Sequence, residues 1–249
     1  VGRLQAIRAG AGPTILLLHG VGLKAEAWNQ QIAMLEQAYR VMAPDMPGHG
    51  DSPWQEPLST LADYTDRVAE ALREPVVAIG HSMGAMMAFD LSIRYSDLVL
   101  GVAGLNAIYR RTDEAAKAVR LRAASLAPDQ VPDPQAPIER WFGTRVSSEK
   151  EACRQWLTSV NPAGYKAAYD VFATEDGPNG HDLGALTCPA LFMTGGEEPN
   201  STPQMSEKMA RQTPKGRAIT IEGAAHMMPM THSAEVNAAL LEFAQECTR

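Results

Sequence analysis

Three kinds of feature are scarce in these 249 residues: cysteine pairs, long apolar runs and runs of positive charge. Cys153, Cys188 and Cys247 are odd in number and widely spaced, and they form no C-x-x-C motif. This argues against a disulfide framework and against a zinc site, so we expect free thiols in a reducing compartment. Neither a metal ion nor any other cofactor is expected.

The absence of long apolar runs argues against a membrane-spanning segment. No stretch approaches the roughly 18 apolar residues of a membrane span, and the first twelve residues lack the apolar region of a secretory signal. A cytoplasmic protein with no membrane partner is expected, although the sequence begins at Val1 and leaves open what precedes it. The 22 basic and 29 acidic residues give a net charge of −7. Because no block of Lys or Arg could follow a phosphate backbone, nucleic acid is not an expected partner.

Apolar runs that alternate with helical patterns are present in both halves of the chain. Short buried strands are predicted at Thr14–Leu18, Val41–Ala43, Val76–Ile79, Val99–Leu105, Ala190–Thr194 and Ala218–Ile221. Helices are predicted at Ala25–Ala38, Leu61–Leu72, Ala85–Ile93 and Ala234–Phe243. Strands that alternate with helices predict an α/β fold, with a mostly parallel sheet covered by helices on both faces.

One segment interrupts this alternation. Between about 109 and 187 no strand is apparent, and helices are predicted at Glu114–Leu126, Ile138–Phe142, Glu149–Val160 and Pro162–Thr174, with Val131–Pro137 as an irregular crossing piece. We therefore expect a core domain of residues 1–108 and 188–249. Residues 109–187 are expected to form a helical cap, or lid, over the strand ends.

The motif Gly80-His81-Ser82-Met83-Gly84 follows an apolar strand and precedes a helix. G-x-S-x-G in this context predicts the sharp turn that raises a nucleophilic serine above a sheet. A serine hydroxyl needs a base to take its proton and an acid to orient that base. His226 follows the last predicted strand through a loop of small residues and is the predicted base. Glu198, in the loop after the preceding strand, is the predicted acid, with Glu197 as the alternative.

The backbone amides of Val21 and Met83 are the predicted donors to the oxyanion. Met83 directly follows the nucleophile, and Val21 lies in a glycine-rich loop after an early strand. His19 and His81 are expected to brace these loops rather than to react.

Together these motifs resemble those of the α/β-hydrolase family over nearly the whole chain. The resemblance rests on His19-Gly20, on Asp45 to Ser52, on Gly80 to Gly84, on the Gly195 to Pro199 loop and on Gly223 to His226. Asn161 to Tyr165 and Asn237 to Leu241 are similar to segments of esterases and lactonases of the 3-oxoadipate enol-lactonase type. The family more often has Asp at the acid position, so Glu198 departs from its pattern.

The predicted reaction is hydrolysis of a small carboxylic ester or lactone through an acyl-enzyme on Ser82. Cleavage of a carbon-carbon bond in a β-diketone-like, meta-cleavage-type substrate by the same triad is one alternative, and a non-catalytic small-ligand sensor is another. Substrate contacts are expected from Trp141, Phe142, Tyr165 and Met227, and the other cap aromatics Trp156, Tyr169 and Phe172 are further candidates. The sequence leaves the oligomeric state open, with a homodimer as one alternative.

Overall fold

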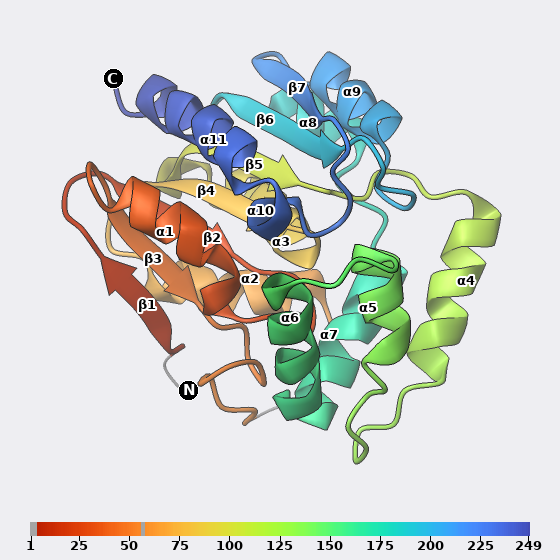
Figure 1. Ribbon diagram of the computed structural model, residues 1–249. Coiled ribbons are helices and arrows are strands. Elements are labelled where there is room, and N and C mark those ends of the chain that lie inside the picture. The colour runs from red at the N-terminus through yellow and green to blue at the C-terminus, as the bar shows by residue number, and fades with distance from the viewer. Residues whose placement is uncertain (1–3, 56–57) are drawn as a thin grey trace.

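One sheet runs through the computed structural model, which describes residues 4–55 and 58–249 (Figure 1). Within these ranges the strand order, from edge to edge, is β1, β3, β2, β4, β5, β6 and β7. The strands are β1 (Ala6–Ala9), β2 (Thr14–Leu18), β3 (Arg40–Pro44), β4 (Val76–His81), β5 (Val99–Leu105), β6 (Ala190–Gly195) and β7 (Gly216–Ile221). Strand β1 pairs antiparallel with β3, and the other neighbouring pairs are parallel. The predicted, mostly parallel sheet is confirmed.

The central strands are buried on both sides. Strands β2, β4 and β6 are buried along their whole length. Because side chains alternate along a strand, Ile15 and Leu17 enter the core on one face of the sheet, whereas Leu16 and Leu18 enter the core on the other. An uninterrupted apolar run is therefore required in a strand of this sheet.

Helices supply the other half of each core (Figure 1). Helices α1 (Asn29–Leu35) and α11 (Ser233–Cys247) contact each other and contribute to the core on one face. Helices α2 (Leu61–Ala71), α3 (Met83–Arg94) and α9 (Pro203–Gln212) contribute to the core on the opposite face. The remaining short elements of the core region are η1 (Ala25–Trp28), η2 (Ser96–Leu98) and α10 (Met228–Thr231).

Five consecutive helices lie between β5 and β6, and no strand interrupts them in this fully described stretch. They are α4 (Asp113–Ala124), α5 (Gln135–Phe142), α6 (Ser148–Ser159), α7 (Pro162–Thr174) and α8 (Gly180–Ala185). Side-chain caps at Thr112, Ser147, Asn161 and Asn179 accept backbone N–H groups and begin four of these helices. In Figure 1, helices α4 to α7 lie together beside one end of the sheet.

Two predicted elements differ from the structure. The single helix expected over Ala25–Ala38 is divided into η1 and α1, because Trp28 leaves the helical conformation (φ −97°, ψ 7°) between them. The irregular piece expected at Val131–Pro137 ends earlier, since α5 already begins at Gln135. Pro137 lies in the first turn of that helix, where its missing N–H would have no intrahelical acceptor.

The three cysteines are free thiols, as expected, with Cys153 buried. Among the residues that the structure describes, none of the helices has both the length and the apolar character needed to cross a membrane.

Candidate active site

Ser82 lies on the turn between strand β4 and helix α3. Its φ of 57° and ψ of −120° form a conformation that costs a non-glycine residue about 1–3 kcal/mol. The Ser82 N–H donates to the carbonyl of Leu105 at the end of β5, 2.9 Å away, and this bond holds the turn against the sheet. The Ser82 hydroxyl has no hydrogen-bond partner in the part of the chain that the structure describes. A substrate in the adjacent cavity can therefore reach it.

The two glycines of the motif allow the turn to close. A Cβ atom on Gly80 would overlap the carbonyl of Gly84, and a Cβ atom on Gly84 would overlap the carbonyl of Leu18. The backbone of α3 thus approaches strands β2 and β4 more closely than any side chain would permit. This is the steric reason for glycine at both ends of G-x-S-x-G.

His226 and Glu198 meet beside this turn. His226 lies in the loop after β7, and its Nδ1 is 2.8 Å from Glu198 Oε2. The Glu198 side chain is fully buried. Its other oxygen, Oε1, accepts the backbone N–H groups of Asn200 at 2.8 Å and Ser201 at 3.4 Å. The carboxylate therefore has a fixed orientation and presents one oxygen to the imidazole.

Electrostatics favour an ionised Glu198. Burial alone would raise the pKa of this carboxyl, but His226 and the amides of Asn200 and Ser201 outweigh burial and lower it to about 2. The alternative acid, Glu197, is exposed to solvent. The structure thus brings Glu198, and not Glu197, to His226.

The backbone carbonyl of His226 is held from two sides. It accepts hydrogen bonds from His81 Nε2 at 2.8 Å and from Asn106 Nδ2 at 2.7 Å. Asn106 is buried and has a φ of 50°, and its Oδ1 accepts the N–H of Gly195 at 3.0 Å. Asn106 therefore ties the ends of β5 and β6 to the histidine loop. Sequence reasoning assigned no role to Asn106, although a polar residue directly after a buried strand could have indicated this one.

Three further histidines are buried around the strand ends. His19 Nε2 accepts the N–H of Met46 at 2.9 Å, so His19 braces the loop after β3. Burial lowers the pKa of His19 to about 4 and, with help from neighbouring histidines, the pKa values of His49 and His81 to about 3. All three imidazoles are therefore neutral near pH 7.

We expect these histidines to make the fold sensitive to acid. Below the ordinary histidine pKa of 6.5, the unfolded chain binds three protons that the folded chain excludes until the pH approaches 4 to 3. The free energy of unfolding should therefore fall by about 4 kcal/mol per pH unit between about pH 6 and 4.5. Asp45, whose pKa burial raises, offsets part of this loss.

Urea unfolding at pH 7, 6 and 5 measures this slope. The His49→Asn variant should lose about one third of it, whereas replacement of the exposed His181 by Asn should leave it unchanged. A wild-type slope below about 1 kcal/mol per pH unit would contradict buried neutral histidines.

Two backbone amides near Ser82 have no acceptor in the described ranges. Met83 is the first residue of α3, so its N–H has no acceptor within the helix. Val21 lies in the loop after β2, and a Cβ atom on its neighbour Gly20 would be 3.0 Å from Ser82 Cβ. Neither amide donates a hydrogen bond within the described ranges. Both predicted oxyanion donors are thus unused in this structure and lie next to the serine in sequence or space.

A cavity of about 290 Å³ opens beside these groups. Ser82, His226, Val21 and Asn106 line it from the strand ends, and residues of α4, α5 and α7 line the other side. Two predicted substrate contacts, Trp141 and Tyr165, belong to its wall, as do the candidates Tyr169 and Phe172. The Trp141 ring stacks on His226 with centroids 5.7 Å apart and an interplanar angle of 17°.

The other two predicted substrate contacts do not reach the cavity. Phe142 and Met227 are buried in the hydrophobic core and are absent from the cavity wall, as is Trp156. Adjacent residues of a helix point about 100° apart, so the orientation that brings Trp141 to the cavity turns Phe142 away. Substrate contacts from Phe142 and Met227 therefore remain a prediction that the shape of this cavity does not support.

Sequence reasoning also missed three arginines in the wall, Arg111, Arg122 and Arg140. One signal was available for Arg122. It follows Ala115 and Val119 at helical spacing on α4, so it shares the face on which apolar residues are expected. In the described ranges no group of three His, Cys, Asp or Glu side chains is arranged to hold a metal ion.

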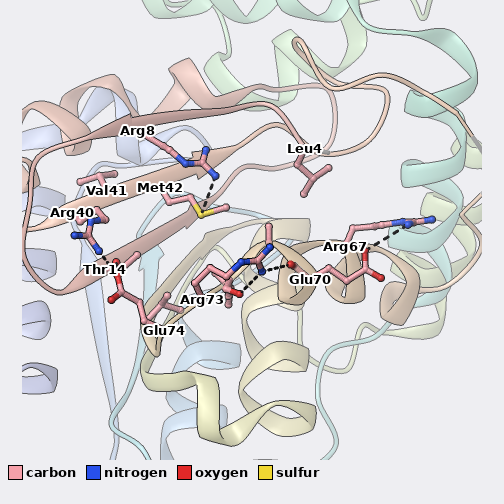
Figure 2. A pocket seen from close by; sticks show the side chains of 13 residues that line it. Leu4, Arg8, Thr14, Arg40, Val41, Met42, Arg67, Glu70, Arg73 and Glu74 are labelled. Atoms are coloured by element: carbon pink, nitrogen blue, oxygen red, sulfur yellow. Dashed lines mark hydrogen bonds and ion pairs between the residues drawn. The ribbon is translucent and has the colours of Figure 1, made fainter. Parts of the chain in front are cut away.

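A second hollow, of about 390 Å³, lies at the opposite end of the strands (Figure 2). It opens beside Thr14 and Arg40, the first residues of β2 and β3. Figure 2 shows Arg40 directed to Glu74, with which it forms an ion pair, and Arg73 donating to the backbone carbonyl of Glu70. Its described wall contains no serine, cysteine or histidine. The hollow therefore lacks the chemical groups found around Ser82.

Residues 15–239 match the model of the Alpha/beta hydrolase family. A protein of Acinetobacter baylyi named "(E)-2-((N-methylformamido)methylene)succinate hydrolase" is 39% identical over 239 residues, which cover 93% of this chain and 90% of that protein.

Solved structures give the same picture of the fold. A thermophilic esterase from Thermogutta terrifontis, solved with malate bound, superposes with a TM-score of 0.87 at 29% identity, over 99% of this chain and 94% of that one. The enol-lactonase of Burkholderia xenovorans superposes with a TM-score of 0.83 over 96% and 95% of the two chains. At 21% identity, the second likeness concerns the fold alone.

Proposed function

This chain belongs to the alpha/beta hydrolase family, and from that premise we propose that it hydrolyses a small carboxylic ester or lactone through an acyl-enzyme on Ser82. One observation carries the proposal: His226, held by a 2.8 Å hydrogen bond to the buried Glu198, lines the same cavity as a strained serine whose hydroxyl has no partner in the described ranges. A histidine with no catalytic role would not need a buried carboxylate to fix the orientation of its ring. Enzymes of the family with hydrolase activity, including the relatives above, support the same reaction class.

In the proposed mechanism, Ser82 Oγ attacks the substrate carbonyl carbon while His226 Nε2 takes the hydroxyl proton. The Glu198 carboxylate accepts a hydrogen bond from the Nδ1–H group of His226 and stabilises the imidazolium that forms. The N–H groups of Val21 and Met83 donate to the oxyanion of the tetrahedral intermediate. His226 then protonates the leaving alcohol oxygen, and the carbon-oxygen bond breaks. A water molecule, deprotonated by His226, then attacks the acyl carbon, and His226 returns that proton to Ser82 Oγ as the carbon–Oγ bond breaks, which releases the acid and restores the serine.

The cavity wall supports a role for helices α4 to α8 as a cap. Residues of α4, α5 and α7 face Ser82 and His226 across the cavity. We propose that residues 109–187 form this cap and select the substrate, and that the enzyme acts in the cytoplasm on a small molecule.

One relative favours a second substrate type. The Acinetobacter baylyi protein is named for hydrolysis of a substituted methylenesuccinate. We propose to test that compound beside simple esters and lactones, together with a β-diketone for carbon-carbon cleavage. The same triad can serve each of these reactions, so the substrate panel discriminates among them.

Labelling with a fluorophosphonate probe tests the proposal without a known substrate. We expect one adduct, mapped to Ser82 by mass spectrometry, and its loss in the His226→Ala variant. Absence of an adduct under conditions that label a control serine esterase would overturn the proposal and favour a ligand sensor.

A further inference from the structure

The charge of the cavity is opposite to that of the chain. The protein has 29 acidic and 22 basic residues. Among the described residues of the cavity wall there are three arginines and no aspartate or glutamate. Glu198 lies behind His226 and does not line the cavity. A cleft with one sign of charge attracts ligands of the other sign, so this cavity favours anions.

Arg111 uses its hydrogen-bond donors within the protein. Its guanidinium donates to the backbone carbonyls of Glu175 and Phe172, lies over the Phe172 ring and is 3.8 Å from Asp176 Oδ1. Its side chain is only 5% exposed. Arg111 therefore joins the start of α4 to the end of α7 and contributes positive charge rather than free donors.

Arg122 and Arg140 differ from Arg111 in this respect. Arg122 donates from Nε to the Tyr169 hydroxyl at 3.2 Å, and its two terminal nitrogens have no partner among residues 4–55 and 58–249. Arg140 has neither a hydrogen bond nor an ion pair with any described residue. Both residues are half-buried. Their donors thus face a partly enclosed space with no protein acceptor.

The chemistry of the guanidinium indicates the ligand. Its planar array of N–H donors matches the two oxygens of a carboxylate, and it remains charged at all relevant pH values. Packing of the alkyl stems alone would not require two arginines in one cavity wall, since lysine or an apolar residue would also fill that space. Arg140 lines the same cavity as Ser82, His226 and the Trp141 that stacks on His226, so its charge borders the space that a substrate of Ser82 would occupy.

We propose that Arg122 and Arg140 form a carboxylate-binding subsite, and that the substrates are esters or lactones carrying a second, ionised carboxyl group in the acyl part. This inference rests on the proposed function, because the carboxylate must be bound while Ser82 attacks the other carbonyl. The substrate class is therefore derivatives of small dicarboxylic acids.

The first test compares two esters of matched shape by pH-stat titration. Monoethyl succinate carries the carboxylate, and in ethyl 4-methylpentanoate an isopropyl group takes its place. We expect kcat/KM of the wild type to favour the anionic ester by at least about tenfold. In Arg122→Gln and Arg140→Gln this preference should fall about 10- to 100-fold, which is the effect of losing a charge-assisted hydrogen bond.

The matched control is Arg120→Gln, on the same helix as Arg122. Arg120 is exposed and does not line the cavity, so its replacement removes one positive charge but should leave the preference unchanged. Equal kcat/KM values for the two esters in the wild type would overturn the carboxylate subsite, as would an equal loss of preference in all three variants.

A second readout separates this inference from the proposed function. Succinate should slow fluorophosphonate labelling of Ser82 in the wild type. For each protein, the succinate concentration that halves its own unprotected labelling rate is measured, and Arg140→Gln should raise this concentration about 10- to 100-fold. Labelling of Ser82 without protection by succinate would overturn the subsite and leave the proposed function standing. Absence of labelling would overturn the proposed function itself.

Discussion

Replacement of Ser82 by alanine is expected to lower kcat for the best ester substrate by about 10⁶-fold, because no other group can form the acyl-enzyme. The oxyanion donors and the cavity would remain, so binding should change little. The variant should also fold. Its backbone N–H still donates to Leu105, and alanine tolerates a φ of 57° no better and no worse than serine. Steady-state kinetics and thermal melting of both proteins measure these two effects.

Ser92→Ala provides the matched control. Ser92 is a buried serine on the same helix, α3, where its hydroxyl donates to the carbonyl of Phe89 at 2.7 Å. Its replacement should leave kcat within about threefold, since Ser92 does not line the cavity. If Ser82→Ala kept more than about 1% of wild-type kcat, the acyl-enzyme mechanism would be wrong.

The change Glu198→Gln is expected to lower kcat by about 10⁴-fold through the wrong histidine tautomer. In Glu198, Oε1 accepts the N–H groups of Asn200 and Ser201, whereas Oε2 faces His226 Nδ1. In glutamine the carbonyl oxygen should take the Oε1 position, because only an acceptor satisfies those amides. The NH₂ group would then donate to Nδ1 and force the imidazole proton onto Nε2, which could no longer accept a proton from Ser82.

Glu197→Gln tests whether this effect depends on position. Glu197 is the adjacent residue and is exposed, so the variant changes the net charge in the same way without a contact to His226. Its kcat should stay within about twofold of wild type. A comparable loss in both variants would contradict the assignment of Glu198 as the acid.

The buried elements could be predicted from the sequence with the greatest accuracy. Strand β2 and helix α7 begin and end where the sequence places them, at Thr14–Leu18 and Pro162–Thr174. Their signals are strong: an apolar run in the first, and an N-cap with Pro at the first position in the second. Strand β1 was missed because it has four residues at the edge of the sheet, and none of them is fully buried.

Helix α9 was missed although its start has a recognisable signal. Thr202 and Pro203 stand at its N-cap and first positions, and Met205 and Met209 follow at a spacing of four. The remaining residues of α9 are mostly polar, so its apolar stripe is narrow. The composition of the segment therefore resembles that of a loop.

The groups around Ser82 were predictable because each of them follows a strand. The order of the motifs along the chain implies where each of these strands lies in the sheet. The cavity wall was not, since it depends on how α4, α5 and α7 pack against one another. Arg122 and Arg140 are separated in sequence by an irregular stretch, and no period relates them. Their shared cavity is a property of tertiary packing, which a single sequence does not encode in any local pattern.

The position of the five helices between β5 and β6 has a consequence for evolution. These two strands are parallel neighbours, with Gly104 opposite Phe192 and Leu105 opposite Met193, so the chain leaves the sheet at the carboxyl end of β5 and returns at the amino end of the strand beside it. Insertions, deletions or exchange of the intervening segment need not shift the register of any strand. New ligand preferences can therefore arise by drift or recombination within one contiguous stretch of the gene, without a change in the strands that position the residues at the ends of β4, β6 and β7.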